Sequence, residues 1–92
     1  MEIKHKDDSE NGIFYIEQHG EPIAEMTYVW ANKDRIIIDH TQVDSSLKGQ
    51  GVGQQLVSKA VEFARIKHIK IVPACSFAKR VFEQTPQFND VL

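Results

Sequence analysis

The chain has 92 residues, of which 41% are hydrophobic, and its formal net charge is -2. This length is enough for one small hydrophobic core, so we expect a single domain spanning residues 1–92. The weak negative charge and the scattered basic residues argue against a nucleic-acid partner. No apolar run could span a membrane, and no signal peptide follows Met1. The single cysteine, Cys75, cannot form an internal disulfide, so we expect a cytoplasmic protein.

The first half of the sequence predicts an antiparallel β-meander. Residues 2–6 are predicted as an edge strand, and alternating apolar and polar residues predict strands over 13–18 and 23–30, with a turn at 19–22. A further strand is predicted over 35–43. Its centre, Ile36-Ile37-Ile38, is apolar on both faces, as expected for a strand in the middle of a sheet.

The second half predicts a helix, a strand and a second helix. Apolar residues recur with the helical period from Val52, and this helix should end near Lys67 or His68. A short strand over 69–72 stops at Pro73 and should run parallel to the strand over 35–43. A last helix is expected over 76–84, closed by Pro86. The sequence therefore predicts an α/β (α+β) fold.

Three alternating glycines, Gly49, Gly51 and Gly53, lie between the strand over 35–43 and the helix that follows. Glycine can adopt a positive φ and turn its NH group toward a ligand, and the first NH groups of a helix have no partner within it. These features favour an anion site over a simple turn. A P-loop is excluded because Lys48 precedes the glycines, and a dinucleotide fingerprint is excluded because GxGxxG is incomplete.

The segment Lys48-Gly49-Gln50-Gly51-Val52-Gly53 resembles the coenzyme A pyrophosphate loop of the GNAT acetyltransferase superfamily. That pattern is Arg or Gln, two residues, Gly, one residue, then Gly or Ala, and Lys48 keeps the charge of the first position. A second block over 75–83 has the layout of a C-terminal GNAT motif. Cys75 stands where the family usually has Asn, and Phe82 stands where many members have the Tyr that protonates the departing thiolate.

The resemblance covers the chain from about Arg35 to its end and is closest to a very short subfamily with a cysteine at this point. It implies a minimal GNAT-like fold that lacks the helical pair after the first strand and the last two strands. It also implies acetyl-CoA as cofactor. The implied binding residues are His40, Thr41, Gln42 and Val43 for the pantetheine arm, and Lys48, Gly49, Gln50, Gly51, Val52, Gly53 and Gln54 for the pyrophosphate.

Two residues are candidates for a catalytic role. Cys75 begins the last helix, where the helix dipole stabilises a thiolate, although a lone cysteine after a buried strand is often a packing residue. His40 could act as a base or orient the acyl group, but a partly buried histidine with satisfied hydrogen bonds is the favoured interpretation. Asp34 and Glu25 are further conceivable bases. The four histidines are too scattered to predict a metal site.

The resemblance implies an N-acetyltransferase in which an amine attacks the thioester directly while strand NH groups near Val43 orient the acyl carbonyl. The alternative is a non-enzymatic module that binds coenzyme A or acyl-CoA and senses thiols through Cys75. A third interpretation is a protein-interaction domain that has lost the ligand. The sequence identifies neither the amine acceptor, a small molecule or a protein, nor the oligomeric state.

Overall fold

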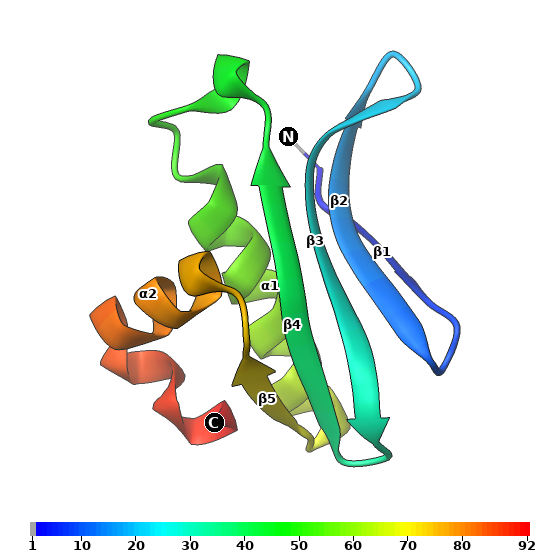
Figure 1. The fold of residues 1–92 in the computed structure, drawn as a ribbon, viewed down its shortest axis with the longest axis vertical. Coiled ribbons are helices and arrows are strands. Elements are labelled where there is room, and N and C mark those ends of the chain that lie inside the picture. Colours follow the sequence, from blue (N-terminus) through cyan, green and yellow to red (C-terminus); the bar gives the residue numbers. More distant parts are fainter. Residues whose placement is uncertain (1) are drawn as a thin grey trace.

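The computed structural model describes residues 2–92. A five-stranded sheet has the order β1-β2-β3-β4-β5, with the first four strands antiparallel and β5 parallel to β4 (Figure 1). The strands are β1 (Lys4–Asp7), β2 (Asn11–Gln18), β3 (Glu21–Asn32), β4 (Arg35–Val43) and β5 (Lys70–Pro73). The helices are α1 (Val52–Lys67) and α2 (Ser76–Gln84), and two 3₁₀ helices are η1 (Ser45–Leu47) and η2 (Pro86–Val91). The predicted order of elements and the parallel last strand are confirmed.

Several predicted boundaries are wrong by a few residues. The edge strand lies over Lys4–Asp7 instead of 2–6, because its pairing with β2 extends to Asp7 opposite Gly12. The turn predicted over 19–22 is confined to His19 and Gly20, both with positive φ, so Pro22 belongs to β3. The sequence did not predict η1 or η2, which are too short to show a helical period.

The predicted strand over 69–72 begins one residue later because Ile69 completes the end of α1. His68 adopts a left-handed conformation with φ of 58°, and the NH of Ile69 donates to the carbonyl of Ala64 over 3.0 Å. This bond caps a carbonyl that has no partner within the helix. The side chain of Ile69 is buried, so both the hydrogen bond at the helix end and packing in the core hold this residue in place.

The hydrophobic core lies between one face of the sheet and the two helices. Side chains of alternate strand residues, such as Phe14, Met26 and Ile38, pack in one cluster with residues of α1 and α2. In the view of Figure 1, both helices lie toward the β5 edge of the sheet, and β1 and β2 form the opposite edge. The opposite sheet face carries half-buried Ile13 and Val29 and is not covered by these helices.

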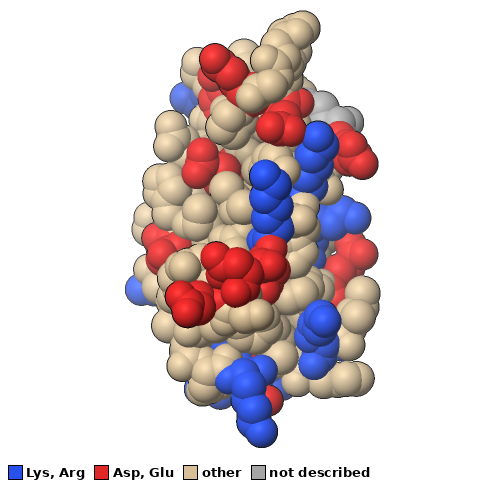
Figure 2. Space-filling view, turned by 90° about the vertical axis from the view of Figure 1, so that its right-hand side faces the viewer, with Lys and Arg blue, Asp and Glu red and all other residues tan. Residues whose placement is uncertain are grey.

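Side chains of both charges are interspersed on the β1–β2 side of the molecule, which Figure 2 views. The Lys4 ammonium pairs with Glu17 over 2.9 Å, and the Lys6 ammonium lies 5.4 Å from the centre of the Tyr15 ring. This side therefore has no continuous basic stripe of the kind that binds a nucleic-acid backbone. Within residues 2–92, no helix is both long and apolar enough to cross a membrane.

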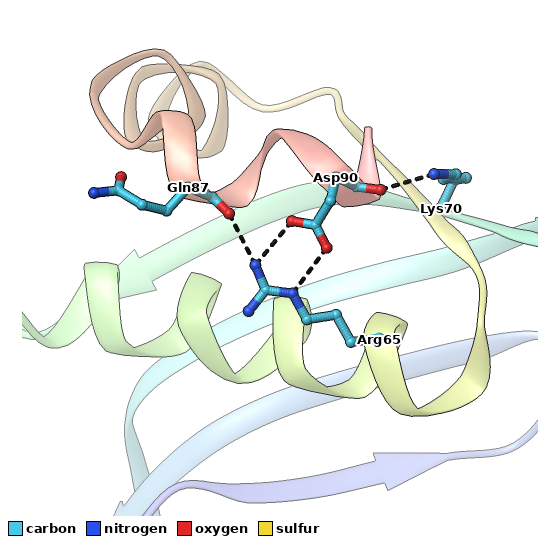
Figure 3. A network of polar contacts seen from close by, with 4 residues as sticks. All are labelled: Arg65, Lys70, Gln87 and Asp90. Carbon is cyan, nitrogen blue, oxygen red and sulfur yellow. Dashed lines mark hydrogen bonds and ion pairs between the residues drawn. The ribbon is translucent and has the colours of Figure 1, made fainter.

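A polar cluster holds the C-terminal segment against α1 (Figure 3). The Arg65 guanidinium donates to both carboxylate oxygens of Asp90, over 2.8 and 2.9 Å, and to the carbonyl of Gln87 over 2.8 Å. The Lys70 ammonium donates to the carbonyl of Asp90 over 2.7 Å. We call these four residues the C-terminal clasp. Because η2 directly follows α2, the clasp also restrains the C-terminal end of α2.

Candidate functional site

The two parallel strands β4 and β5 diverge halfway along β4. They pair only from Arg35 opposite Lys70 to Ile38 opposite Pro73. The NH groups of Ala74 and Cys75 then both donate to the carbonyl of Ile38, over 2.9 and 3.1 Å, and the chain turns away into α2. Beyond this point, over 39–43, β4 has a neighbouring strand on the β3 side only. Alternate main-chain groups of this half-strand therefore face the gap without a strand partner.

A β-bulge marks the same point of β4. Thr27 of β3 lies opposite His40 and the next residue, Tyr28, lies opposite Ile38, so Asp39 is the extra residue. The Thr27 hydroxyl donates to the Asp39 carboxylate over 2.7 Å. A bulge bends the strand and increases its twist, which helps β4 leave the line of β5.

The loop after β4 requires glycine at two positions. Gly49 has a φ of 83° and Gly51 a φ of 71°, and a β-carbon at either position would meet no atom within 4 Å. The constraint at these two residues is therefore the backbone conformation and not lack of space. Gly53 differs, because it lies in the first turn of α1 with the ring of Phe77 against it.

Main-chain NH groups without acceptors within residues 2–92 cluster where this loop enters α1. The five groups are those of Gly49, Gly51, Val52, Gly53 and Gln54. The first turn of α1 carries no acidic side chain. The N-terminal end of the helix dipole adds positive potential at the same place. This arrangement suits a phosphate or pyrophosphate group.

A cleft of about 350 Å³ lies beside these NH groups, between the loop, α1 and α2. Loop, strand and α1 contribute Val43, Leu47, Lys48, Gly49, Gly51, Val52, Gly53 and Gln54, and α2 contributes Phe77, Arg80, Val81 and Gln84. Two side chains of the lining are cationic and none is a carboxylate. The predicted binding residues of the loop are thus brought together around one cleft, except Gln50, which does not line it.

Sequence reasoning missed the contribution of α2 to this cleft. Phe77, Arg80, Val81 and Gln84 follow the spacing i, i+3, i+4, i+7, which places them on one face of the helix. Half of this face is polar, so the pattern does not stand out as a core-facing stripe. The spacing itself was the available signal.

Cys75 lies at the point where β5 turns away from β4. Its side chain is partly buried, and its sulfur accepts a hydrogen bond from the NH of Ala78 over 3.4 Å as the N-cap of α2. The hydroxyl of Thr41 lies 3.5 Å from the same sulfur. Thr41 and Cys75, both predicted site residues, therefore meet across the gap between the strands.

His40 is not brought near Cys75. It pairs with Thr27 in register, whereas Thr41 pairs with Met26 of the core, so His40 lies on the sheet face without helices. The favoured interpretation of His40 as a partly buried, hydrogen-bonded residue is wrong: the residue is exposed, and its ring makes no hydrogen bond within residues 2–92. The bulge at Asp39 and the strand alternation together decide this orientation.

The remaining candidates lie apart from the cleft. Asp34 is in the β3–β4 turn, at the opposite end of β4 from the glycine loop, and Glu25 pairs with Gln42 in register. Phe82 is buried, with its ring centre 6.0 Å from that of Phe88. Within residues 2–92, no three His, Cys, Asp or Glu side chains lie close enough to hold a metal ion.

A larger groove, of about 550 Å³, lies over β1, β2 and β3. Its lining includes Asp7, Asp8, Ile13, Thr27 and Asp39 but none of the glycine loop. The smaller cleft combines unpaired NH groups and two cations, and it reaches Val43 at the end of the half of β4 that leaves β5. We therefore take the smaller cleft as the candidate site.

Residues 13–91 match the model of a family described as GCN5-related N-acetyl-transferase. No curated protein is similar enough to this sequence to count as a relative. Among solved structures, a GCN5-like protein from Staphylococcus aureus is 41% identical, with a TM-score of 0.77 over 98% of this chain and 85% of its own.

Two more distant structures share the fold. A ribosomal-protein-alanine N-acetyltransferase from Brucella melitensis is 16% identical, with a TM-score of 0.63 over 84% of this chain and 62% of its own. A GNAT family acetyltransferase from Elizabethkingia anophelis, solved with acetyl-CoA bound, is 19% identical. Its TM-score is 0.60 over 83% of this chain and 52% of its own. The chain thus spans only about half to two thirds of these two larger proteins.

Proposed function

This chain belongs to the GCN5-related N-acetyltransferase family, and on that basis we propose that it transfers an acetyl group from acetyl-CoA to an amine. The observation that carries the proposal is the group of five NH donors without acceptors within residues 2–92, those of Gly49, Gly51, Val52, Gly53 and Gln54. Water can satisfy these NH groups, but an anion accepts their hydrogen bonds more strongly because they lie at the positive end of the helix dipole. The pyrophosphate of coenzyme A supplies that anion.

The residues present fit the rest of the donor molecule. Lys48 adds a positive charge beside the glycine loop, and the apolar side chains of Val43, Leu47 and Val81 line the cleft. The half of β4 over 39–43 offers main-chain groups to the amides of the pantetheine arm, as an added strand would. Thr41, Gln42 and Val43 are the residues we assign to that role.

In this proposal the acceptor nitrogen attacks the thioester carbonyl directly. The C–N bond forms, the C–S bond breaks, and coenzyme A leaves as the thiolate while the nitrogen gives its proton to water. Main-chain NH groups near Val43 orient the carbonyl and stabilise the charge on its oxygen. Phe82 has no proton to donate, so the thiolate is protonated by solvent or by the Cys75 thiol, which Thr41 contacts.

A binding or thiol-sensing module is the second candidate function. It is favoured by one observation: the partly buried sulfur of Cys75 lies at the strand gap, while the usual acid is replaced by the buried Phe82. In that case the Cys75 thiolate would attack oxidised coenzyme A, the symmetric disulfide, to form a mixed disulfide and release one coenzyme A thiol, and no acetyl group would reach an amine.

One set of experiments separates the two functions. Acetyl-CoA binding is measured by calorimetry, transfer is measured against a panel of primary amines, and adducts are detected by intact mass. Binding with turnover, retained largely in Cys75→Ala, supports direct transfer. Binding without turnover, together with a reducible adduct that forms on incubation with oxidised coenzyme A and that Cys75→Ala abolishes, identifies the sensing module. Absence of any binding would refute both.

A further inference from the structure

The candidate cleft has one cation on each of two walls. Lys48 comes from the glycine loop and Arg80 from α2. Both residues are exposed, and neither forms an ion pair with a carboxylate within residues 2–92, whereas Lys4, Lys59 and Arg65 do. The two walls therefore offer separate positive charges to a ligand.

Arg80 is held on its wall by a fixed helix. The neighbouring Ala78 and Val81 are buried in the core, and the ring of Phe77 packs against Gly53 of α1. Lys79, the adjacent residue, does not line the cleft. The direction of the Arg80 side chain is thus set by the orientation of α2 and not by a mobile loop.

The two walls differ in what else they offer an anion. The loop wall has NH groups without acceptors in addition to Lys48, and these suffice for a pyrophosphate. On the α2 wall the NH groups beyond the first turn are used within the helix, so the donors there are side chains, and Arg80 is the cation among those that line the cleft. A guanidinium binds a phosphate through two parallel hydrogen bonds.

Acetyl-CoA carries a third phosphate, on the 3′ position of its ribose, apart from the pyrophosphate. We propose that Arg80 binds this 3′-phosphate and that the protein thereby distinguishes acetyl-CoA from acetyl-dephospho-CoA. The inference rests on the proposed function, because it assumes that the pyrophosphate occupies the glycine loop. Lys48 serves the pyrophosphate that both compounds share, and Arg80 serves the group that only one of them has.

The test compares the affinities of acetyl-CoA and acetyl-dephospho-CoA by calorimetry. The parent protein should bind acetyl-CoA about tenfold more tightly, the usual effect of a charge-assisted bond to phosphate. Arg80→Gln should remove most of this preference by weakening acetyl-CoA alone. Lys79→Gln is the matched control, with the same charge change on the same helix, and should keep the preference. Lys48→Gln should weaken both ligands several-fold and by the same factor.

Each other result would overturn the inference. Equal weakening of both ligands by Arg80→Gln would place the guanidinium on the pyrophosphate. Unchanged affinities would remove Arg80 from the site, and a selective loss in Lys48→Gln would assign the 3′-phosphate to the loop wall. If the parent binds acetyl-dephospho-CoA as tightly as acetyl-CoA, this inference fails while the proposed function stands. If the parent binds neither, the proposed function fails first.

Discussion

The ring of Phe77 occupies the space where a side chain on Gly53 would begin. A β-carbon built on Gly53 lies only 2.4 Å from Cζ of Phe77. The two residues join the first turns of α1 and α2, and both line the candidate cleft. The third glycine of the loop is therefore required for the close approach of two helices, whereas Gly49 and Gly51 are required for their positive φ.

Gly53→Ala should destabilise the protein because the new methyl group displaces the Phe77 ring. Overpacking of this kind costs about 1–3 kcal/mol in free energy of unfolding. The sign should reverse when Phe77 is first replaced by Ala, because Ala is then the better helix former by about 0.5–1 kcal/mol. Urea unfolding of the two single variants and the double variant measures this. A loss that persists in the double variant would contradict the role of the ring.

Gly51→Ala should lower stability through backbone strain alone, since the added β-carbon meets open space. The left-handed conformation costs a residue with a β-carbon about 1–2 kcal/mol. Gly20→Ala is the matched control, with a φ of 79° and open space but a position in the β2–β3 turn. Gly51→Ala and Gly20→Ala should lose similar stability in urea. Only the Gly51 variants should also weaken acetyl-CoA binding, and the bulkier Gly51→Val should weaken it at least about tenfold. Equal binding by the Gly51 and Gly20 variants would contradict the loop assignment.

Tyr28 connects β1 to the core through two polar contacts. Its hydroxyl donates to the Asp7 carboxylate and lies 2.7 Å from Nε2 of His5. Because the hydroxyl has one proton to give, Nε2 of His5 must be the donor in the second bond. Tyr28→Phe should therefore cost about 0.5–1.5 kcal/mol, the usual net contribution of a hydrogen bond, because the partners Asp7 and His5 are exposed and can turn to water. The free energy of unfolding at neutral pH measures it, and an unchanged value would mean that water replaces the hydroxyl.

The protein should lose stability as the pH falls below about 6.5. Burial, only partly opposed by the Asp7 charge, holds the pKa of His5 below its ordinary value of 6.5. The unfolded chain therefore binds a proton first, and stability falls as the pH drops from 6.5 toward the folded value. The slope of unfolding free energy between pH 7.5 and 5.5 should decrease in His5→Gln. His19→Asn, a change in an exposed turn, should keep the parent slope.

Asp7 should add a second loss of stability in stronger acid. Burial by itself would raise the pKa of this carboxyl, but hydrogen bonds from Tyr28, the NH of Ser9 and Trp30 outweigh it and hold the pKa below 3.8. The stabilisation is complete above 3.8 and is lost as the pH falls through the folded value. Asp7→Asn should abolish this second loss, which acid titration followed by circular dichroism detects.

The C-terminal clasp should restrain α2 through η2. Arg65→Asp and Asp90→Arg should each lower the thermal unfolding midpoint by a few degrees, and the double variant should recover part of the loss because the pair is restored in reverse. Both side chains are exposed, so the effect should decrease at high salt. If each single variant has the same unfolding midpoint as the parent, the clasp does not hold η2 in place, and other contacts determine the position of η2.

Local features of the sequence were sufficient for the order of elements and for the glycine loop. Alternation and helical periodicity reflect which side chains each element buries, and Gly49 and Gly51 have the positive φ that their residue type permits. The parallel pairing of β4 and β5 was also predictable, because a helix connects them. The ends of elements were less predictable. Ile69, for example, was predicted to begin the strand, but its NH donates to the carbonyl of Ala64 at the end of α1.

Contacts between distant segments decided the rest. The bulge at Asp39 and the register of β3 against β4 place His40 on the face opposite Cys75, although a strand run of isoleucines gave no sign of a bulge. Arg80 joins the cleft only because Phe77 packs on Gly53 and sets the orientation of α2. Register and helix orientation depend on the fit of side chains far apart in the chain. For that reason the sequence alone determined the glycine loop that we propose as the anion site, and only the tertiary structure determined which side chains face it.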